Sequence, residues 1–328
     1  MNKLSLIAML VAGGLGIDVH ADGSALRSEL ASKDGWIGYH VPAVKGSGST
    51  CCYSGKLGGT AGARCDLDTR KGTFVTDDRA SSASGDLAIY WHVTNGRPDQ
   101  VRAFSADCPV TSQQEVRWID PVDARESVAA TAEWMDRNDK RRDSEGFPAL
   151  ALQAHVDATA ALIALAAPSR PLDSRKEAIF WLGQARGADG ANFVEKVAAG
   201  DASPDLREHA VFALSESNVD DAYERVRAIS KKDASGDVRG KALFWMAQME
   251  DPRAAADISA ALSSETSEDV REEAVFALSQ LEDAAATAAL IAVIRGNHPR
   301  AVKEKALFWL GQAGTDEAMA FIDAVLTE

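Results

Sequence analysis

Five phenylalanines recur at a fixed interval of 32 residues in the C-terminal half of this 328-residue chain. They are Phe180, Phe212, Phe244, Phe276 and Phe308, and each lies in a related string, from IFWLGQ in the first to LFWLGQ in the last. An unbroken period of this length indicates a stack of similar structural units, because one short unit cannot bury its apolar face alone.

The same register contains apolar columns that predict two helices in each unit. A column of the first helix comprises Leu150, Leu182, Leu214, Met246, Leu278 and Leu310. A column of the second comprises Leu162, Val194, Val226, Ile258, Leu290 and Ile322. Apolar residues within a unit are three and four apart, the spacing of an amphipathic helix. We expect six helix pairs over residues 146–328, with a degenerate first pair and a last pair that can act as a cap.

Residues 22–120 lack helical periodicity and are rich in glycine, serine and threonine, which indicates a β-rich domain. We expect strands at residues 36–41, 87–94, 101–105 and 116–119. Asn95-Gly96 stands between the second and third of these strands and is a strong signal for a hairpin turn. Residues 46–62 are expected to form a mobile loop tethered by cysteines.

Residues 121–145 are expected to be a helix and a charged linker between the two parts. Pro121 suits the first turn of a helix that would end near Arg137. Its apolar face would contain Val128, Ala129, Ala132 and Met135. The predicted fold class is therefore α+β, with a small disulfide-bonded β-rich domain followed by an all-α solenoid.

The first 21 residues have the features of an export signal. Lys3 supplies the positive start, residues 4–17 the apolar stretch, and Val19-His20-Ala21 a cleavage motif. The apolar stretch is shorter than the roughly 20 residues that span a bilayer, so an uncleaved anchor is the lesser alternative. We expect a secreted, periplasmic protein without a transmembrane segment in the mature chain.

All four cysteines lie in the first third of the chain: Cys51, Cys52, Cys65 and Cys108. An even number confined to one exported segment indicates a disulfide framework. A bond between the adjacent Cys51 and Cys52 would strain its short ring, so we expect each to pair with one of the other two. A zinc site is the alternative, but the spacing matches no usual zinc pattern, and no metal is expected.

The net charge of −14 restricts the possible partners. Much of the acidic excess lies in the repeats, and no cluster of lysine and arginine interrupts it. Such a surface repels phosphate backbones, which makes nucleic acid an unlikely partner.

The helix that carries the phenylalanine begins with a periodic Asp-x-Arg pattern. We expect the aspartates at N-cap positions, where a carboxylate accepts free backbone N–H groups. These residues are Asp173, Asp205, Asp237 and Asp269, followed two residues later by Arg175, Arg207, Arg239 and Arg271. A recurring alanine three residues after each arginine gives neighbouring backbones room to approach.

The pattern Asp-x-Arg-x-x-Ala-x-x-Ala/Trp-Leu/Met resembles the HEAT repeat, in particular the bacterial HEAT-like type also found in phycobilisome lyases. The resemblance covers residues 146–328. It implies a right-handed α-solenoid with the Asp-x-Arg helices on the concave side, and a structural Asp–Arg ladder between successive units. The WIGYHVP and FSADCPV strings also resemble exported bacterial HEAT-repeat proteins, which implies no particular activity.

The phenylalanine column departs from that pattern, because HEAT-like repeats normally carry a charged or variable residue there. At about 100° per residue, Phe212 lies roughly opposite the buried Leu214. Four residues after each phenylalanine, on the same helix face, stands a polar residue. These residues are Gln184, Glu216, Gln248, Gln280 and Gln312. We expect both columns to line the concave surface.

Three interpretations of these columns remain. Adjacent units lie about 10 Å apart, which matches three residues of extended chain at roughly 3.3 Å each, so rings and amides can bind a peptide. Alternatively, each ring packs into the seam between units, or the N-terminal domain covers the row. Tryptophans alternate with alanines at a period of 64 residues, which favours packing of large against small side chains over direct ligand contact. They are Trp181, Trp245 and Trp309, with Ala213 and Ala277 between them.

Catalytic motifs are lacking in the sequence. HEAT-like hydroxylases use repeated His-Glu pairs, whereas this chain offers Glu208-His209 alone, and it has no nucleophile elbow or phosphate loop. We therefore predict a non-catalytic scaffold without cofactors that binds a protein or peptide in the cell envelope. The alternatives are an envelope sensor, with the N-terminal domain as receiver and the solenoid as relay, and, less favoured, a HEAT-like lyase or hydroxylase.

Overall fold

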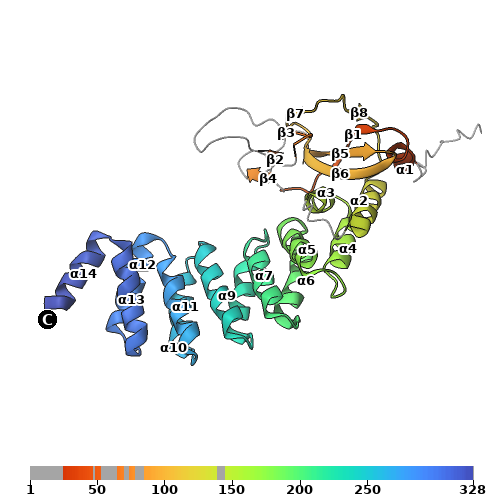
Figure 1. Cartoon of the computed structure of the whole chain (residues 1–328). Coiled ribbons are helices and arrows are strands. Elements are labelled where there is room, and N and C mark those ends of the chain that lie inside the picture. Colours follow the sequence, from red (N-terminus) through yellow and green to blue (C-terminus); the bar gives the residue numbers. More distant parts are fainter. Residues whose placement is uncertain are drawn as a thin grey trace, which may run out of the picture.

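The computed structural model describes residues 25–46, 49–52, 65–69, 74–77, 85–138 and 145–327. The predicted export signal and most of residues 46–62 lie outside these ranges. Figure 1 shows a β-sheet region at one end and a long array of helix pairs extending from it. The predicted α+β class, with a β-rich part followed by helical repeats, is confirmed.

The main sheet has four strands in the order β6-β5-β1-β8. They are β1 (Gly35–Pro42), β5 (Asp86–Thr94), β6 (Arg97–Ser105) and β8 (Arg117–Trp118). Strands β1, β5 and β6 are antiparallel, and β8 pairs in parallel with β1. Asn95 and Gly96 connect β5 to β6 with φ angles of 54° and 66°, as a tight hairpin turn requires. All four predicted strands are therefore present.

Two smaller pairs flank this sheet. Strand β2 (Ser49–Cys52) pairs with β4 (Phe74–Asp77), and β3 (Cys65–Asp66) pairs with β7 (Val110–Thr111). The prediction that residues 46–62 are entirely loop is thus wrong at β2. The reason is a partner distant in sequence, since a four-residue strand has too little alternation to be recognised alone.

The two faces of the main sheet are both covered. Ile37, Tyr39 and Trp91 face a core shared with the helices α1 (Ala25–Leu30) and α2 (Ala124–Asn138). Trp36 and Tyr90 face the opposite way, into a second core that includes the cysteine region.

Helix α2 begins at Ala124 and not at Pro121 as expected. The Asp123 carboxylate accepts the backbone N–H groups of Arg125 and Glu126 at 2.9 and 3.2 Å, so Asp123 supplies the cap. The predicted face is correct at Val128 and Met135 but not at Ala129, which is exposed; Trp134 is buried instead.

The six predicted helix pairs are confirmed. The first helices, here called A helices, are α3 (Gly146–Ala151), α5 (Leu172–Ala185), α7 (Pro204–Ser215), α9 (Gly236–Gln248), α11 (Glu268–Ser279) and α13 (Arg300–Ala313). The second, or B helices, are α4 (Val156–Leu165), α6 (Gly187–Gly200), α8 (Ala222–Lys232), α10 (Ala254–Ser264), α12 (Asp283–Arg295) and α14 (Asp316–Thr327). The short α3 agrees with a degenerate first pair.

Successive A helices pack against one another more closely than successive B helices do. The closely packed row of a curved array lies on its inner side, so the A helices line the inner surface. Figure 1 shows the array running from α4 beside the sheet to α14 at the far end.

The sheet and the repeats share one hydrophobic core, which runs from Leu26 to Ala318. Backbone hydrogen bonds of 2.8 Å join Val44 to the carbonyl of Leu152, and Ala154 to the carbonyl of Pro42. Contact between the main sheet and the A helices is concentrated at α3, beyond which the array extends away from it. The β-rich part therefore covers the end of the array.

Candidate functional site

Eight aromatic side chains form a continuous line across the A helices, from α5 to α13. This aromatic row consists of Phe180, Trp181, Phe212, Phe244, Trp245, Phe276, Phe308 and Trp309. Seven ring pairs link them, with centroids 4.8 to 5.7 Å apart, within the range of favourable ring contact. The rings therefore contact one another from unit to unit.

The contacts in the aromatic row alternate with a period of two units. Phe180 and Phe212 stack at 5.7 Å with 13° between their planes, and the next pair, Phe244 with Phe276, stacks at 5.7 Å and 7°. Trp245 fills the place between these pairs and lies 4.8 Å from Phe212. This arrangement agrees with large side chains opposite small ones.

The phenylalanine rings are partly exposed to solvent. Phe180, Phe212, Phe244 and Phe276 are half-buried, and Phe308 at the far end is 54% exposed. Half-buried rings on the inner row of helices leave their edges accessible along the surface. Their role in binding stays a prediction.

The predicted polar column lies beside the aromatic row, one helical turn further along each A helix. Gln184 is half-buried, whereas Glu216, Gln248, Gln280 and Gln312 are exposed. We call these five residues the amide row. The four glutamine amides supply donors and acceptors next to apolar rings, and the Glu216 carboxylate supplies acceptors alone. This combination suits the backbone and side chains of a peptide.

A third line, of which the sequence analysis identified only the four aspartates, precedes the rings by one or two helical turns. This charged row consists of Asp173, Lys176, Glu177, Asp205, Glu208, Asp237, Lys241, Asp269, Glu272, Glu273, Glu304 and Lys305. His209 belongs to the same line, and its ring lies 5.8 Å from that of Phe212. Carboxylates outnumber lysines in the row. The other members, at positions 176–177, 208, 241, 272–273 and 304–305, recur in the same 32-residue register.

Two glutamates of the charged row, Glu177 and Glu208, have raised pKa values. Burial raises the pKa of Glu177, and the neighbouring Asp173 adds to this rise. Burial likewise raises the pKa of Glu208, with contributions from Asp237 and Asp205, while two lysines act in the opposite direction. Burial is thus the larger cause at both residues, and neighbouring carboxylates add to it.

The arginines of the Asp-x-Arg pattern do form a ladder, but with other carboxylates than those predicted. Arg207 donates to both carboxylate oxygens of Asp233 at 2.9 and 3.0 Å, and also to the carbonyl of Asp201 at 2.9 Å. Arg239 bonds to Glu265 at 2.8 Å in the same way. Each arginine thereby joins the ends of two successive B helices.

The equivalent bonds at the two ends of the ladder follow the same plan. Arg175 bonds to the Asp201 carboxylate at 2.5 Å, and Arg271 donates to the carbonyl of Glu265 at 2.8 Å. The Arg239 guanidinium, together with backbone N–H groups, lowers the pKa of Glu265 from 4.5 to about 2.

The predicted ladder aspartates occupy the first turns of the A helices and not the N-caps. The N-cap residues are Pro171, Ser203, Ser235 and Ser267. Ser203 and Ser267 accept a backbone N–H through their hydroxyl groups. In the described part of the chain, Asp173, Asp205, Asp237 and Asp269 form no ion pair; all four are exposed.

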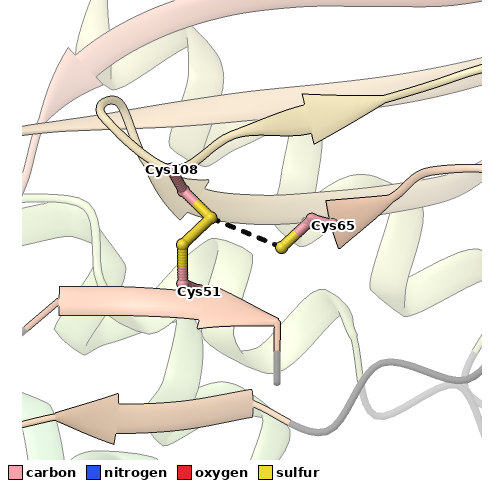
Figure 2. Close-up of side chains that lie close together, drawn as sticks. All are labelled: Cys51, Cys65 and Cys108. Carbon is pink, nitrogen blue, oxygen red and sulfur yellow. Dashed lines mark hydrogen bonds between the residues drawn. A yellow bond between two sulfur atoms is a disulfide. The ribbon is translucent and has the colours of Figure 1, made fainter. Parts of the chain in front are cut away.

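The cysteine region lies on the opposite side of the sheet from the repeats. Cys51 and Cys108 are joined by a disulfide with a Cα–Cα distance of 5.6 Å, as one of the expected pairings. Figure 2 shows the Cys65 sulfur directed at this bond, 3.4 Å from the Cys108 sulfur. The pairing of Cys52 stays a prediction, because its side chain lies outside the described residues.

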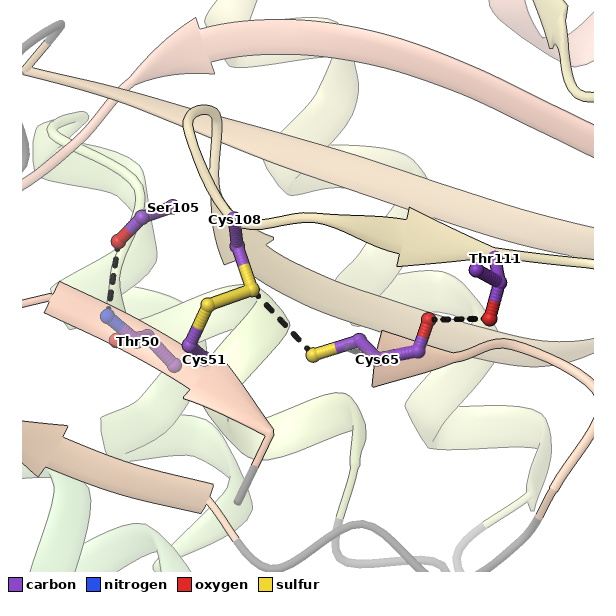
Figure 3. Close-up of a disulfide and its surroundings, with 6 residues drawn as sticks. All are labelled: Thr50, Cys51, Cys65, Ser105, Cys108 and Thr111. Carbon is purple, nitrogen blue, oxygen red and sulfur yellow. Dashed lines mark hydrogen bonds between the residues drawn. A yellow bond between two sulfur atoms is a disulfide. The ribbon is translucent and has the colours of Figure 1, made fainter. Parts of the chain in front are cut away.

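The three described sulfurs lie within 4.8 Å of one another, close enough in principle to hold a metal ion. A disulfide, however, removes the thiolates that zinc requires, and Cys65 is disulfide-bonded as well. Figure 3 shows hydrogen bonds on both sides, from Thr50 N–H to Ser105 at 2.8 Å and from Thr111 to the Cys65 carbonyl. The region therefore fits a structural role.

His209 is the histidine of the Glu-His pair considered for catalysis. Its Nε2 lies 2.8 Å from the Lys176 carbonyl, and burial lowers its pKa. Of the described residues, only the cysteine group brings three metal-ligating side chains together. His209 thus packs between neighbouring A helices.

This geometry defines a class of protein, a solenoid of helix pairs that presents a long inner surface. Residues 224–311 match the family of HEAT repeats, and the shared register extends that pattern over all six pairs. This part of the chain is therefore of the HEAT-repeat type.

Other comparisons add little to this assignment. The structure of human deoxyhypusine hydroxylase in complex with glycerol is similar at 18% identity, over 58% of this chain and 75% of that one, with a TM-score of 0.32. No curated protein matches the chain. None of the described helices combines the length and apolar character needed to cross a membrane.

Proposed function

We propose that this protein is a non-catalytic scaffold of the cell envelope that binds a protein through a peptide segment laid along the aromatic and amide rows. The observation that carries the proposal is the continuous line of half-exposed rings over five successive A helices. Solenoids use extended inner surfaces of this kind for binding. Rings and amides at one turn's separation supply apolar contacts and backbone hydrogen bonds together.

The spacing of the units supports an extended ligand. Neighbouring A helices are about 10 Å apart, so that each unit corresponds to about three residues of a strand-like peptide at 3.3 Å per residue. Five units would hold a segment of about fifteen residues by this spacing. An envelope location is supported by the Cys51–Cys108 disulfide, which is typical of oxidising compartments.

The test is a selection of peptides from a phage-displayed random library on the full-length protein. A triple variant, Phe212→Ala, Phe244→Ala and Phe276→Ala, should lose binding of the selected peptides by about tenfold or more, because it removes the central apolar contacts. Circular dichroism should show that helix content is retained.

A matched control separates the row from other exposed apolar residues. Val156, Met319 and Val325 are 73%, 46% and 41% exposed and lie outside the aromatic row. Changing all three to alanine should leave peptide binding unchanged. Failure to select any peptide, or equal losses in both triple variants, would contradict the proposed function.

A further inference from the structure

We propose that the bound segment is basic: an extended peptide with lysine or arginine at about every third residue, whose cationic ends reach the charged row while their methylene stems lie on the aromatic row. This inference rests on the proposed function and specifies its partner. It follows from a comparison of which carboxylates have ion-pair partners on the outer and inner sides of the solenoid.

Several carboxylates on the central B helices form ion pairs with arginines. Glu195 pairs with Arg225 at 2.6 Å, and Asp257 pairs with Arg227 at 2.7 Å. Glu224 is also shared between arginines. These three carboxylates on α6, α8 and α10 are therefore held in ion pairs, whereas Asp316, Glu317 and Asp323 on α14 form none within the described residues.

Most of the described carboxylates on the inner side have no ion-pair partner. Within the described ranges, Glu177, Glu208 and Glu273 form no salt bridge, and neither do the four first-turn aspartates. The exceptions lie near the far end, where Lys305 pairs with Glu272 at 3.0 Å and Arg300 with Glu304 at 2.6 Å. The arginines of the Asp-x-Arg pattern do not neutralise these carboxylates, because they bind the ends of the B helices.

At Glu208 these unpaired carboxylates repel one another across units, although Lys176 and Lys241 offset part of the repulsion. The Asp237 carboxylate acts on Glu208 of the preceding unit, and burial limits the water that would screen them. Glu273 lies tightly over the backbone at Gly240, where an added Cβ would be 3.0 Å from its side chain. A cationic ligand would relieve this repulsion at each unit.

The aromatic row explains why we expect a peptide with long basic side chains as the ligand, and not a free small cation. Lysine and arginine place their methylene groups on apolar surface while the charged end reaches polar groups nearby. Ring and carboxylate are one helical turn apart on each A helix, about 5 to 6 Å. The repeat of this arrangement sets a basic residue at about every third position of an extended chain.

The experiment uses three fluorescent peptides of repeated triplets, Arg-Gly-Ser, Gln-Gly-Ser and Glu-Gly-Ser, with one triplet for each of α5, α7, α9, α11 and α13. Fluorescence anisotropy measures their binding to the full-length protein at about 50 mM and about 300 mM NaCl, since salt screens exposed charges. The Arg peptide should bind about tenfold more tightly than the Gln peptide at low salt, and the difference should shrink at high salt.

Two charge-matched variants locate the site. Glu177→Gln, Glu208→Gln and Glu273→Gln together should weaken binding of the Arg peptide by about tenfold. The control, Asp316→Asn, Glu317→Gln and Asp323→Asn, removes as much charge from the exposed side of α14 and should change binding less than about twofold. Equal effects in the two variants would show general attraction only and overturn the inference.

The outcome also separates this inference from the function on which it rests. If the peptides selected from the random library lack basic residues yet depend on Phe212, Phe244 and Phe276, the basic ligand is wrong and the binding surface stands. If neither selected nor Arg peptides depend on these rings, both proposals fail.

Discussion

In the sheet, the indole N–H of the fully buried Trp91 donates to the Tyr39 hydroxyl at 3.0 Å, and that hydroxyl lies 2.8 Å from the Ser127 hydroxyl. Trp36 and Trp134 likewise donate to protein acceptors. In the repeats, no hydrogen bond is found from the indoles of the aromatic row to any described residue. The N–H of Trp309 is even enclosed without a partner.

The difference shows that the two regions use aromatic side chains for different purposes. A ring that belongs to a closed core brings its polar atom to a partner, because an unsatisfied buried donor costs about 1 to 3 kcal/mol. The rings of the repeats contact one another without such partners, and all of them except the buried Trp181 remain partly exposed. They are a surface feature ordered by packing, and their loss should affect binding more than stability.

The largest expected effect is the removal of a core ring from the sheet. Trp91→Ala should lower the free energy of unfolding by about 4 kcal/mol, because it leaves a large cavity and takes the donor away from Tyr39. Urea unfolding followed by circular dichroism measures this loss. Trp118, which is 47% exposed, provides the control, and Trp118→Ala should cost much less. Equal costs would contradict the distinction between core and surface rings.

The next effect isolates the polar contact. Tyr39→Phe should cost about 2 kcal/mol, because the Trp91 N–H loses its acceptor and the Ser127 hydroxyl its partner. Burial raises the pKa of Tyr39 to about 12, consistent with its enclosed position. Tyr90→Phe is the control, since among the described residues its hydroxyl has no hydrogen-bond partner. A similar cost at both positions would remove the role of the network.

A single ring of the aromatic row should matter less. Phe244→Ala is expected to cost about 1.5 kcal/mol, because a half-buried ring loses part of the apolar burial of a core residue. Its neighbours Phe276 and Trp245, at 5.7 and 5.0 Å, would remain in place. A loss as large as that of Trp91→Ala would show that the row is core and would weaken the proposed binding surface.

The smallest expected effect is a loss of stability at low pH. Glu265 is depressed to a pKa of about 2 by Arg239. Its contribution, about 1 kcal/mol after allowance for solvent, is present above its unfolded pKa near 4.5 and is lost as pH falls toward 2. Comparing the wild-type protein with Glu265→Gln between pH 7 and pH 2 by urea unfolding isolates this contribution. Their stabilities should converge in acid; a constant difference would contradict the prediction.

Much of the repeat array could be predicted because each unit is local and recurs. The register gave the helix pairs and the buried columns, yet the N-caps were placed two residues late. The signal was present in Ser203, Ser235 and Ser267, but the aspartates two residues later recur in one more unit and are also common N-cap residues. The ladder partners Asp201, Asp233 and Glu265 also recur at 32 residues and could have been found.

The β-rich part was less accessible from sequence. Its longer strands and its hairpin turn have local signals, such as Asn95-Gly96, and were predicted. The pairing of β2 with β4 and of β3 with β7 depends on residues far apart in the chain, as does the core that joins the sheet to α3. Such contacts leave no period, because each occurs once.

The alternation within the aromatic row has a consequence for how such an array can grow. Trp245 and Trp309 each lie against a phenylalanine of the unit before, and Phe180 and Phe244 each stack on the unit after. Deleting or duplicating one helix pair would therefore bring unlike neighbours together, whereas copying two would preserve every ring contact. The natural module for lengthening this protein is a segment of 64 residues, twice the period that its sequence displays.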